Sequence, residues 1–207
     1  MFKDRMDAAN QLAQKLHTYH GKNPLVLGIP RGAVPMAIGM AKALQGEMDV
    51  VLVRKLRAPH QPELAIGAVD ESGWTTMTED AYTCGATENY LATEKQTQMH
   101  TIRQRRAMYS GLRPSISPAG RIVIVVDDGM ATGASMVAAL HSLRTTHPKK
   151  LICAVPVASI EALAKVQTLA DEVVCLQTPS NFEAVGQFYT HFPQVEDEDI
   201  AAMLAKL

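Results

Sequence analysis

Two adjacent carboxylates, Asp127 and Asp128, follow an apolar run in VIVVDDGMATGAS, residues 123–135. Like charges this close cost free energy unless cations or hydrogen-bond donors compensate them. The small residues after them let several backbone N–H groups point one way at the start of the next helix, which suits a phosphate. The stretch is no Walker A loop, because the GxxxxGK[ST] pattern fails. It therefore predicts a phosphate site beside groups that carboxylates bind, such as vicinal sugar hydroxyls, with or without a divalent metal.

Two alternatives stay open for this stretch. It could be an ordinary strand, turn and helix with two tolerated surface acids. It could also ligate a metal directly, although no histidine or third carboxylate lies nearby in the sequence.

The elements that position these residues belong to a predicted parallel sheet. Continuous apolar runs are typical of strands buried on both faces, and the expected strands are Leu25–Ile29, Val50–Val53, Ile122–Val126, Leu151–Val155 and Glu172–Leu176. Helices are expected over Ala33–Leu44, Ala134–Leu143 and Ile160–Leu169, with Ser159 as an N-cap. This alternation predicts an α/β fold with a doubly wound, mainly parallel five-stranded sheet. Ligands bind beyond the carboxyl ends of such strands, where this chain carries Gly28–Gly32, Arg54-Lys55 and Asp127-Asp128.

An insertion over about 56–120 interrupts this alternation within what we expect to be a single domain, residues 1–207. The proline-containing LRAPHQPE (Leu56–Glu63) predicts a loop, while LAIGAVD and WTTMTE predict a hairpin that turns at Glu71–Gly73. Residues 87–110 predict a long helix whose RQRR (Arg103–Arg106) forms a solvated face or a subunit contact. At the C-terminus, a capping box is expected at Ser180–Glu183 and a docking helix at Glu196–Leu207, with Tyr189 and Phe192 packed on that helix.

Composition excludes several classes of function. The 207 residues carry a formal net charge of −1, so no overall attraction to nucleic acid or to a membrane is expected. The N-terminus lacks the apolar core of a signal peptide, and no stretch approaches the 18 or so apolar residues of a membrane span. We therefore expect a cytoplasmic protein.

VIVVDDGMATGAS also resembles the phosphoribosyl-pyrophosphate-binding signature of type I phosphoribosyltransferases. The resemblance extends over nearly the whole chain, through FKDRMDAANQLAQKL, LGIPRGAVPMA, VVLVRKLRAPHQPELAIGAV and PSNFEAVGQFYTHFPQV. These stretches are similar to a subgroup of bacterial phosphoribosyltransferases whose acceptor is unknown.

The resemblance implies a role for each candidate residue. Asp127 and Asp128 would hold the ribose 2- and 3-hydroxyls and help to position Mg²⁺, through water, with the donor as its main chelator. The residues that would cradle the 5-phosphate are Ala131, Thr132, Gly133, Ala134 and Ser135. The residues that would meet the pyrophosphate are Pro30, Arg31, Gly32, Arg54 and Lys55. Asp127, Asp128, Arg31 and Lys55 would be the catalytic residues among them.

The implied activity is transfer of phosphoribose from Mg²⁺-phosphoribosyl pyrophosphate to a nitrogen acceptor, by a homodimer. A closing loop is expected at Leu56–Glu63, where Arg57 and His60 could reach the ligand. The position of Ala131 carries an aspartate in 6-oxopurine enzymes, so a hypoxanthine or guanine acceptor is disfavoured. The acceptor hood could be the hairpin or the 87–110 helix, by position only. The alternative function is a non-catalytic regulatory protein that binds the same donor or a nucleotide, and a weaker one is hydrolysis or phosphorolysis of phosphoribosyl compounds.

Overall fold

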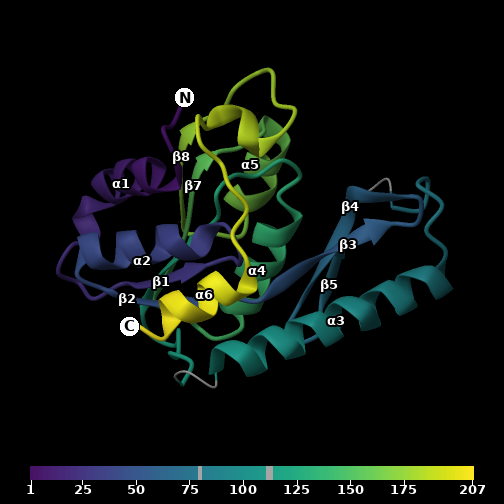
Figure 1. Cartoon of the computed structure of the whole chain (residues 1–207), viewed down its shortest axis with the longest axis horizontal. Coiled ribbons are helices and arrows are strands. Elements are labelled where there is room, and N and C mark those ends of the chain that lie inside the picture. The colour runs from purple at the N-terminus through teal and green to yellow at the C-terminus, as the bar shows by residue number, and fades with distance from the viewer. Residues whose placement is uncertain (79–80, 111–113) are drawn as a thin grey trace.

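A five-stranded parallel sheet forms the centre of the protein (Figure 1). The computed structural model describes residues 1–78, 81–110 and 114–207. The sheet has the order β2-β1-β6-β7-β8, and its strands are β1 (Leu25–Gly28), β2 (Glu47–Val50), β6 (Ile122–Val126), β7 (Lys150–Val157) and β8 (Glu172–Gln177). The strand order reverses between β1 and β6, which are hydrogen-bonded neighbours. This confirms the predicted doubly wound α/β fold and places a ligand-binding switch point where β1 and β6 end.

Helices cover both faces of this sheet. The first face carries α1 (Arg5–Lys15) and α2 (Ala33–Leu44), while the second carries α4 (Ala134–Arg144) and α5 (Ile160–Gln167). Because side chains alternate along a strand, Val26 and Ile124 pack toward the first pair and Leu27 and Val125 toward the second. Ser159 caps α5 as predicted, since its hydroxyl accepts a hydrogen bond from the Ala162 N–H.

A second, antiparallel sheet projects from this core (Figure 1). Its strands, in the order β3-β4-β5, are β3 (Val53–Ala58), β4 (Gln61–Asp70) and β5 (Thr75–Met77). The long helix α3 (Glu88–Ser110) and helix α4 both pack against it. Trp74 stacks on His141 of α4 with ring centroids 3.5 Å apart, which fixes the second sheet to the core. The predicted hairpin is β4 and β5, although Glu79 of its expected second strand lies outside the described residues.

Two predictions about this region were wrong. The expected strand Val50–Val53 is instead the end of β2, a buried link through Val51 and Leu52, and the start of β3. The link is as buried as a strand, so the apolar run concealed a change of sheet. The expected loop Leu56–Glu63 is mostly paired strand. The strands tolerate its two prolines because one falls at the tight turn and the other lies beside a shift in register at Arg57 and Ala58.

The N-terminal residues lie against a segment that precedes the C-terminal helix. Phe2 pairs with Tyr189 in an isolated bridge, with hydrogen bonds from Phe2 N–H to Phe188 C=O and from Thr190 N–H to Phe2 C=O. The remaining elements are η1 (His17–Tyr19), η2 (Val185–Phe188) and α6 (Asp197–Leu204). The C-terminal helix was predicted, but the capping box at Ser180–Glu183 was wrong, because η2 begins two residues later and the Gln187 side chain binds the Glu183 and Ala184 N–H groups.

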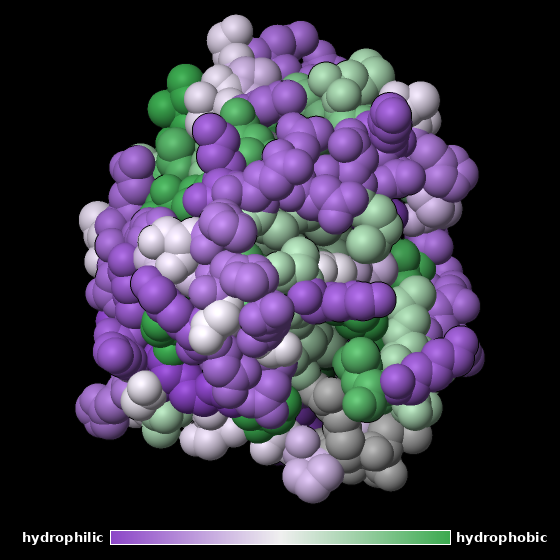
Figure 2. Space-filling view, turned by 90° about the vertical axis from the view of Figure 1, so that its left-hand side faces the viewer, coloured by the Kyte–Doolittle hydropathy of each residue, from purple (hydrophilic) through white to green (hydrophobic). Residues whose placement is uncertain are grey.

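The face on the α1 side is covered mainly by hydrophilic residues, with hydrophobic ones in separate groups (Figure 2). Among the described residues, no helix combines the length and apolar character that crossing a membrane requires.

Candidate functional site

The acid pair, Asp127 and Asp128, lies at the switch point where β6 ends. The Asp128 N–H donates to the Asp127 carboxylate at 2.9 Å. Asp127 lines a hollow with Lys55 and residues 129–136, and the Asp128 carboxylate binds Arg5 of α1 and lies close to Gly32. The pair thus connects two different surroundings.

Asp128 is held by residues that lie far away in the sequence. Arg5 Nε donates to its carboxylate at 2.9 Å. The Arg5 guanidinium also rests on the Phe192 ring, 3.7 Å from the centroid, and donates to the Pro193 carbonyl. Tyr189 donates its hydroxyl to the Asp128 carbonyl at 2.7 Å. Arg5, Tyr189 and Phe192 were missed as site residues. The two aromatics, which were predicted to pack on the C-terminal helix, stack on each other and belong to the hydrophobic cluster that includes Ile200 of that helix.

Burial and mutual repulsion set the protonation of the acid pair. Asp127 is half-buried, and the burial of its carboxyl, followed by the charge of Asp128, raises its pKa. Burial also raises the pKa of Asp128, against the opposing effect of Arg5. Lys55 acts to lower both pKa values. A ligand that offers hydroxyl donors or a cation would therefore relieve an unfavourable charge here.

This burial predicts a dependence of stability on pH. The raised pKa means that the folded chain keeps the Asp127 proton to a higher pH than the unfolded chain does. The contribution of this group to the free energy of unfolding is therefore full below its unfolded pKa of about 4 and is lost as pH rises through the raised pKa. In Asp127→Asn the carboxyl is replaced by an amide that does not titrate, so this loss of stability does not occur.

We expect the free energy of unfolding of Asp127→Asn, relative to wild type, to increase by about 1 kcal/mol or more between pH 5 and pH 7. Urea unfolding in EDTA at the two pH values measures it. A relative stability that stays constant or decreases over this interval would contradict the buried-carboxyl account.

The phosphate loop, residues 129–135, joins β6 to α4. Gly133 has a φ of +76° and is the N-cap of α4, so a glycine is favoured there. The first N–H groups of a helix have no intrahelical partner, and the residues that carry them line the same hollow as the loop. Ser159 supports the loop from α5 by donating its hydroxyl to the Ala131 carbonyl at 2.7 Å. A helix start of this kind is suited to bind an anion.

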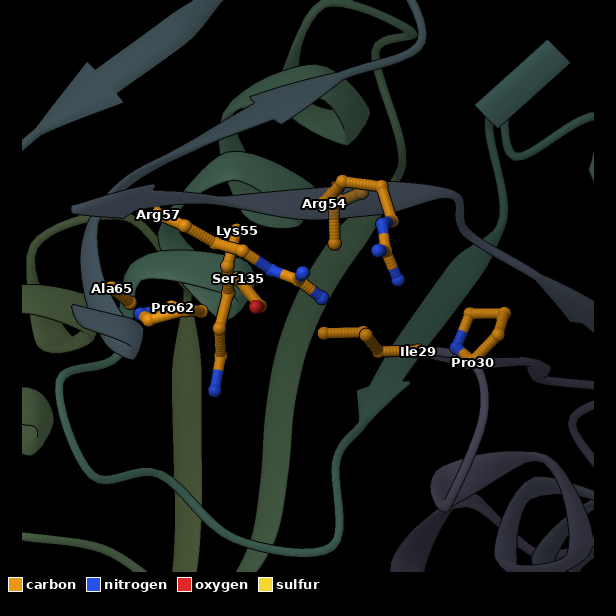
Figure 3. A pocket seen from close by; sticks show the side chains of 9 residues that line it. Ile29, Pro30, Arg54, Lys55, Arg57, Pro62, Ala65 and Ser135 are labelled. Carbon is orange, nitrogen blue, oxygen red and sulfur yellow. The ribbon is translucent and has the colours of Figure 1, made fainter. Parts of the chain in front are cut away.

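A cationic cavity of about 190 Å³ adjoins this loop, between β3 and the loop after β1. Arg54 and Arg57 extend from β3 toward Ile29 and Pro30, and Lys55 lines the cavity from the same strand but points in a different direction (Figure 3). Ser135 lines the same cavity, so the phosphate loop and the cationic cavity are continuous. Arg54 and Lys55 were expected at the end of the second parallel strand, and they reach the site instead from the second sheet. Three cations around one cavity favour a polyanionic ligand.

The loop after β1 meets the acid pair through Gly32. A Cβ at Gly32 would lie 2.0 Å from Asp128 Oδ2, so only glycine allows this approach. Arg31 follows a cis peptide bond and pairs with Glu196 at the start of α6, 2.5 Å away. In this structure the Arg31 side chain therefore lines a different hollow, beside Arg5 and Phe192, and does not line the cationic cavity.

The predicted acceptor hood is not adjacent to Asp128. The hairpin is part of the second sheet, and the 87–110 helix packs against that sheet. Both lie on the Lys55 side of the acid pair. The C-terminal segment instead contacts this part of the chain, because Tyr189 binds the Asp128 carbonyl and Val185 would meet a Cβ at Gly129. Two of the three arginines of RQRR have partners: Arg105 pairs with Asp197, and Arg106 pairs with Glu71.

The comparisons with known proteins agree with this geometry. A family model described as "Phosphoribosyl transferase domain" matches residues 2–192. A Mycobacterium tuberculosis protein named "Putative phosphoribosyl transferase Rv0571c" is 42% identical over 206 residues, which are 99% of this chain and 46% of that protein. The chain therefore spans about half the length of the curated relatives it matches.

Solved structures extend the likeness to the whole fold. The crystal structure of TT1426 from Thermus thermophilus is 44% identical with a TM-score of 0.81, covering 99% of this chain and 98% of that one. A hypoxanthine phosphoribosyltransferase from Staphylococcus aureus, at 14% identity and a TM-score of 0.50, covers 86% of this chain and 75% of that one and shares the fold alone. With a family model that matches almost its full length, this chain belongs to the phosphoribosyl transferase domain family.

Proposed function

We propose that this protein transfers phosphoribose from Mg²⁺-phosphoribosyl pyrophosphate to a nitrogen acceptor and releases pyrophosphate. One observation carries the proposal: Asp127 lines one hollow with the phosphate loop, and a cavity lined by three cations adjoins that hollow at Lys55 and Ser135. Phosphoribosyl pyrophosphate has a phosphate at one end, vicinal hydroxyls in the middle and a pyrophosphate beside them. Each kind of group in the donor therefore has a matching partner in these adjoining surroundings.

In this proposal the acids orient the sugar and the cations receive the leaving group. Asp127 and Asp128 accept hydrogen bonds from the two ribose hydroxyls, which fixes the anomeric carbon relative to both anion sites. As the bond to pyrophosphate breaks, negative charge grows on the leaving group beside Arg54, Lys55 and Arg57. These side chains lie on a paired strand before the ligand arrives, so little reorganisation accompanies the reaction.

Mg²⁺ fits this site as a companion of the donor. Among the described residues, no group of three or more histidine, cysteine, aspartate or glutamate side chains could hold a metal. Asp127 and Asp128 alone would hold the ion, through water, while the donor oxygens supply its other ligands. The ion would supply further neutralisation of the pyrophosphate charge.

The acceptor site in this proposal lies beside Asp128, at the C-terminal segment. Ala131 has no side-chain group that could bind an acceptor atom, and its carbonyl is already bound by Ser159. A 6-oxopurine acceptor would therefore lose a carboxylate partner at this position, which disfavours hypoxanthine and guanine.

Pyrophosphate release tests the proposal. The protein is incubated with Mg²⁺, phosphoribosyl pyrophosphate and a panel of nucleobases and amines, and pyrophosphate is followed with time. We expect release that depends on one acceptor class and is absent without Mg²⁺. Binding of the donor without release for any acceptor would reject the transferase and leave the regulatory donor-binding protein.

A further inference from the structure

One polar stripe on helix α3 runs along the outer side of the cationic cavity. Tyr90, Glu94 and Gln98 are four residues apart, so they lie on one face of the helix. This face packs against β3, the strand that carries the cations of the cavity. The stripe therefore contacts the residues that would bind a ligand and does not itself line the cavity.

Two residues of the stripe hold the backbone of Arg57. Glu94 Oε1 accepts a hydrogen bond from the Arg57 N–H at 3.1 Å, and the Tyr90 hydroxyl donates to the Arg57 carbonyl at 2.9 Å. These bonds occur where the pairing of β3 with β4 shifts register, so they replace regular sheet contacts. The Arg57 side chain extends into the cavity from this fixed backbone (Figure 3).

The third residue holds the side chain of Arg54. Buried Gln98, 4% exposed, accepts a hydrogen bond from Arg54 Nε at 2.9 Å. The Gln98 amide donates in turn to Glu94 Oε1 at 2.9 Å. Arg54, Gln98, Glu94 and Arg57 therefore form one connected chain. Because Nε is engaged, the outer edge of the Arg54 guanidinium is left to face the cavity.

The same helix also holds the segment that pairs with Arg31. Arg105 and Tyr109 bind the carboxylate of Asp197 at 3.0 Å and 2.8 Å. Asp197 is the first residue of α6, directly after Glu196, which pairs with Arg31. Helix α3 thus holds Arg54 and Arg57 directly, and it is connected to Arg31 through the start of α6.

We propose that Gln98 and Glu94 are positioning residues that fix Arg54 and Arg57 for recognition of a pyrophosphate group. In this protein the second sheet and α3 are preorganised for this role. The arginines on β3 would face the pyrophosphate, and hydrogen bonds from α3 hold them in place. The inference rests on the proposed function for its ligand, but the arrangement predicts binding of any pyrophosphate, with or without transfer. Hydrogen bonds of this kind lower the cost of ordering the long arginine side chains on binding.

The test measures binding of two probes to the full chain by calorimetry with Mg²⁺ present. Inorganic pyrophosphate reports on the cationic cavity, and ribose 5-phosphate reports on the acid pair and the phosphate loop. We expect Gln98→Leu and Glu94→Leu to weaken pyrophosphate binding about tenfold and to leave ribose 5-phosphate within about twofold. Glu94→Gln keeps an acceptor oxygen for the Arg57 N–H, so it should retain wild-type affinity for both probes.

Gln104→Leu is the matched control, because Gln104 is exposed on the same helix. Unchanged pyrophosphate affinity in Gln98→Leu, or an equal loss for both probes, would overturn the inference. If Gln98→Leu does not fold, the pyrophosphate affinity of Glu94→Leu is compared with that of Glu94→Gln and of the milder Tyr90→Phe. Unchanged pyrophosphate affinity in Glu94→Leu would then overturn the inference. Wild type that binds no pyrophosphate also overturns it. Wild type that binds pyrophosphate without releasing any from the donor rejects the transferase but keeps the positioning role.

Discussion

Replacing both Asp127 and Asp128 by asparagine is expected to abolish binding of Mg²⁺-phosphoribosyl pyrophosphate while the chain stays folded. Each ionised carboxylate would accept from a ribose hydroxyl, and a hydrogen bond to a charged group contributes about 1.5–3 kcal/mol. Losing two such bonds corresponds to a decrease in affinity of roughly a hundredfold or more. Calorimetric titration of wild type and double variant measures the difference.

The fold should survive this change because burial disfavours the charged carboxyls and raises the pKa of both. Two neutral amides also remove the repulsion between adjacent carboxylates. Glu88→Gln with Glu198→Gln is the control, since both residues are exposed helical acids. Unchanged donor affinity in the Asp127/Asp128 double variant, with circular dichroism like that of wild type, would remove the assigned role of the acid pair.

Gly32→Ala is expected to impair both stability and donor binding. The new Cβ would lie 2.0 Å from Asp128 Oδ2 and 3.0 Å from Arg5 Nε, so the carboxylate has to leave its position. Overpacking of this kind costs about 1–3 kcal/mol, and a displaced carboxylate no longer meets its hydroxyl. We expect donor affinity to fall at least about tenfold, measured together with the urea midpoint.

Gly39→Ala is the matched control for this substitution. Its Cβ would meet only the terminal methyl and sulfur of Met6, and the end of this flexible side chain can move aside. Gly39 lies within α2, where alanine favours the helix. Equal donor affinities in Gly32→Ala and wild type would show that Asp128 does not need its observed position.

The sequence predicted those features that depend on neighbouring residues. Apolar runs predicted most of the parallel strands, and the small residues after Asp128 predicted the tight turn into α4, because buried strands and helix starts leave local signatures. The strand ends then predicted the edge of the sheet at which we propose the site.

Features that depend on contacts between distant residues were not predictable in this way. Arg5 and Asp128 are 123 residues apart, and Arg54 and Gln98 are 44 apart, so no local pattern relates them. The buried link at Val51 and Leu52 resembles a strand interior in composition, which concealed the start of the second sheet. The spacing of Tyr90, Glu94 and Gln98, four residues apart in the 87–110 helix, was the available signal for the stripe that faces β3.

Binding of the donor to the wild-type protein tests the central claim most directly. Calorimetric titration with Mg²⁺-phosphoribosyl pyrophosphate should show saturable binding at one site per chain. Ribose 5-phosphate and inorganic pyrophosphate should each compete, because the phosphate loop and the cationic cavity bind opposite ends of the donor. Absence of saturable binding at millimolar donor, or binding that neither competitor reduces, would contradict the site described here.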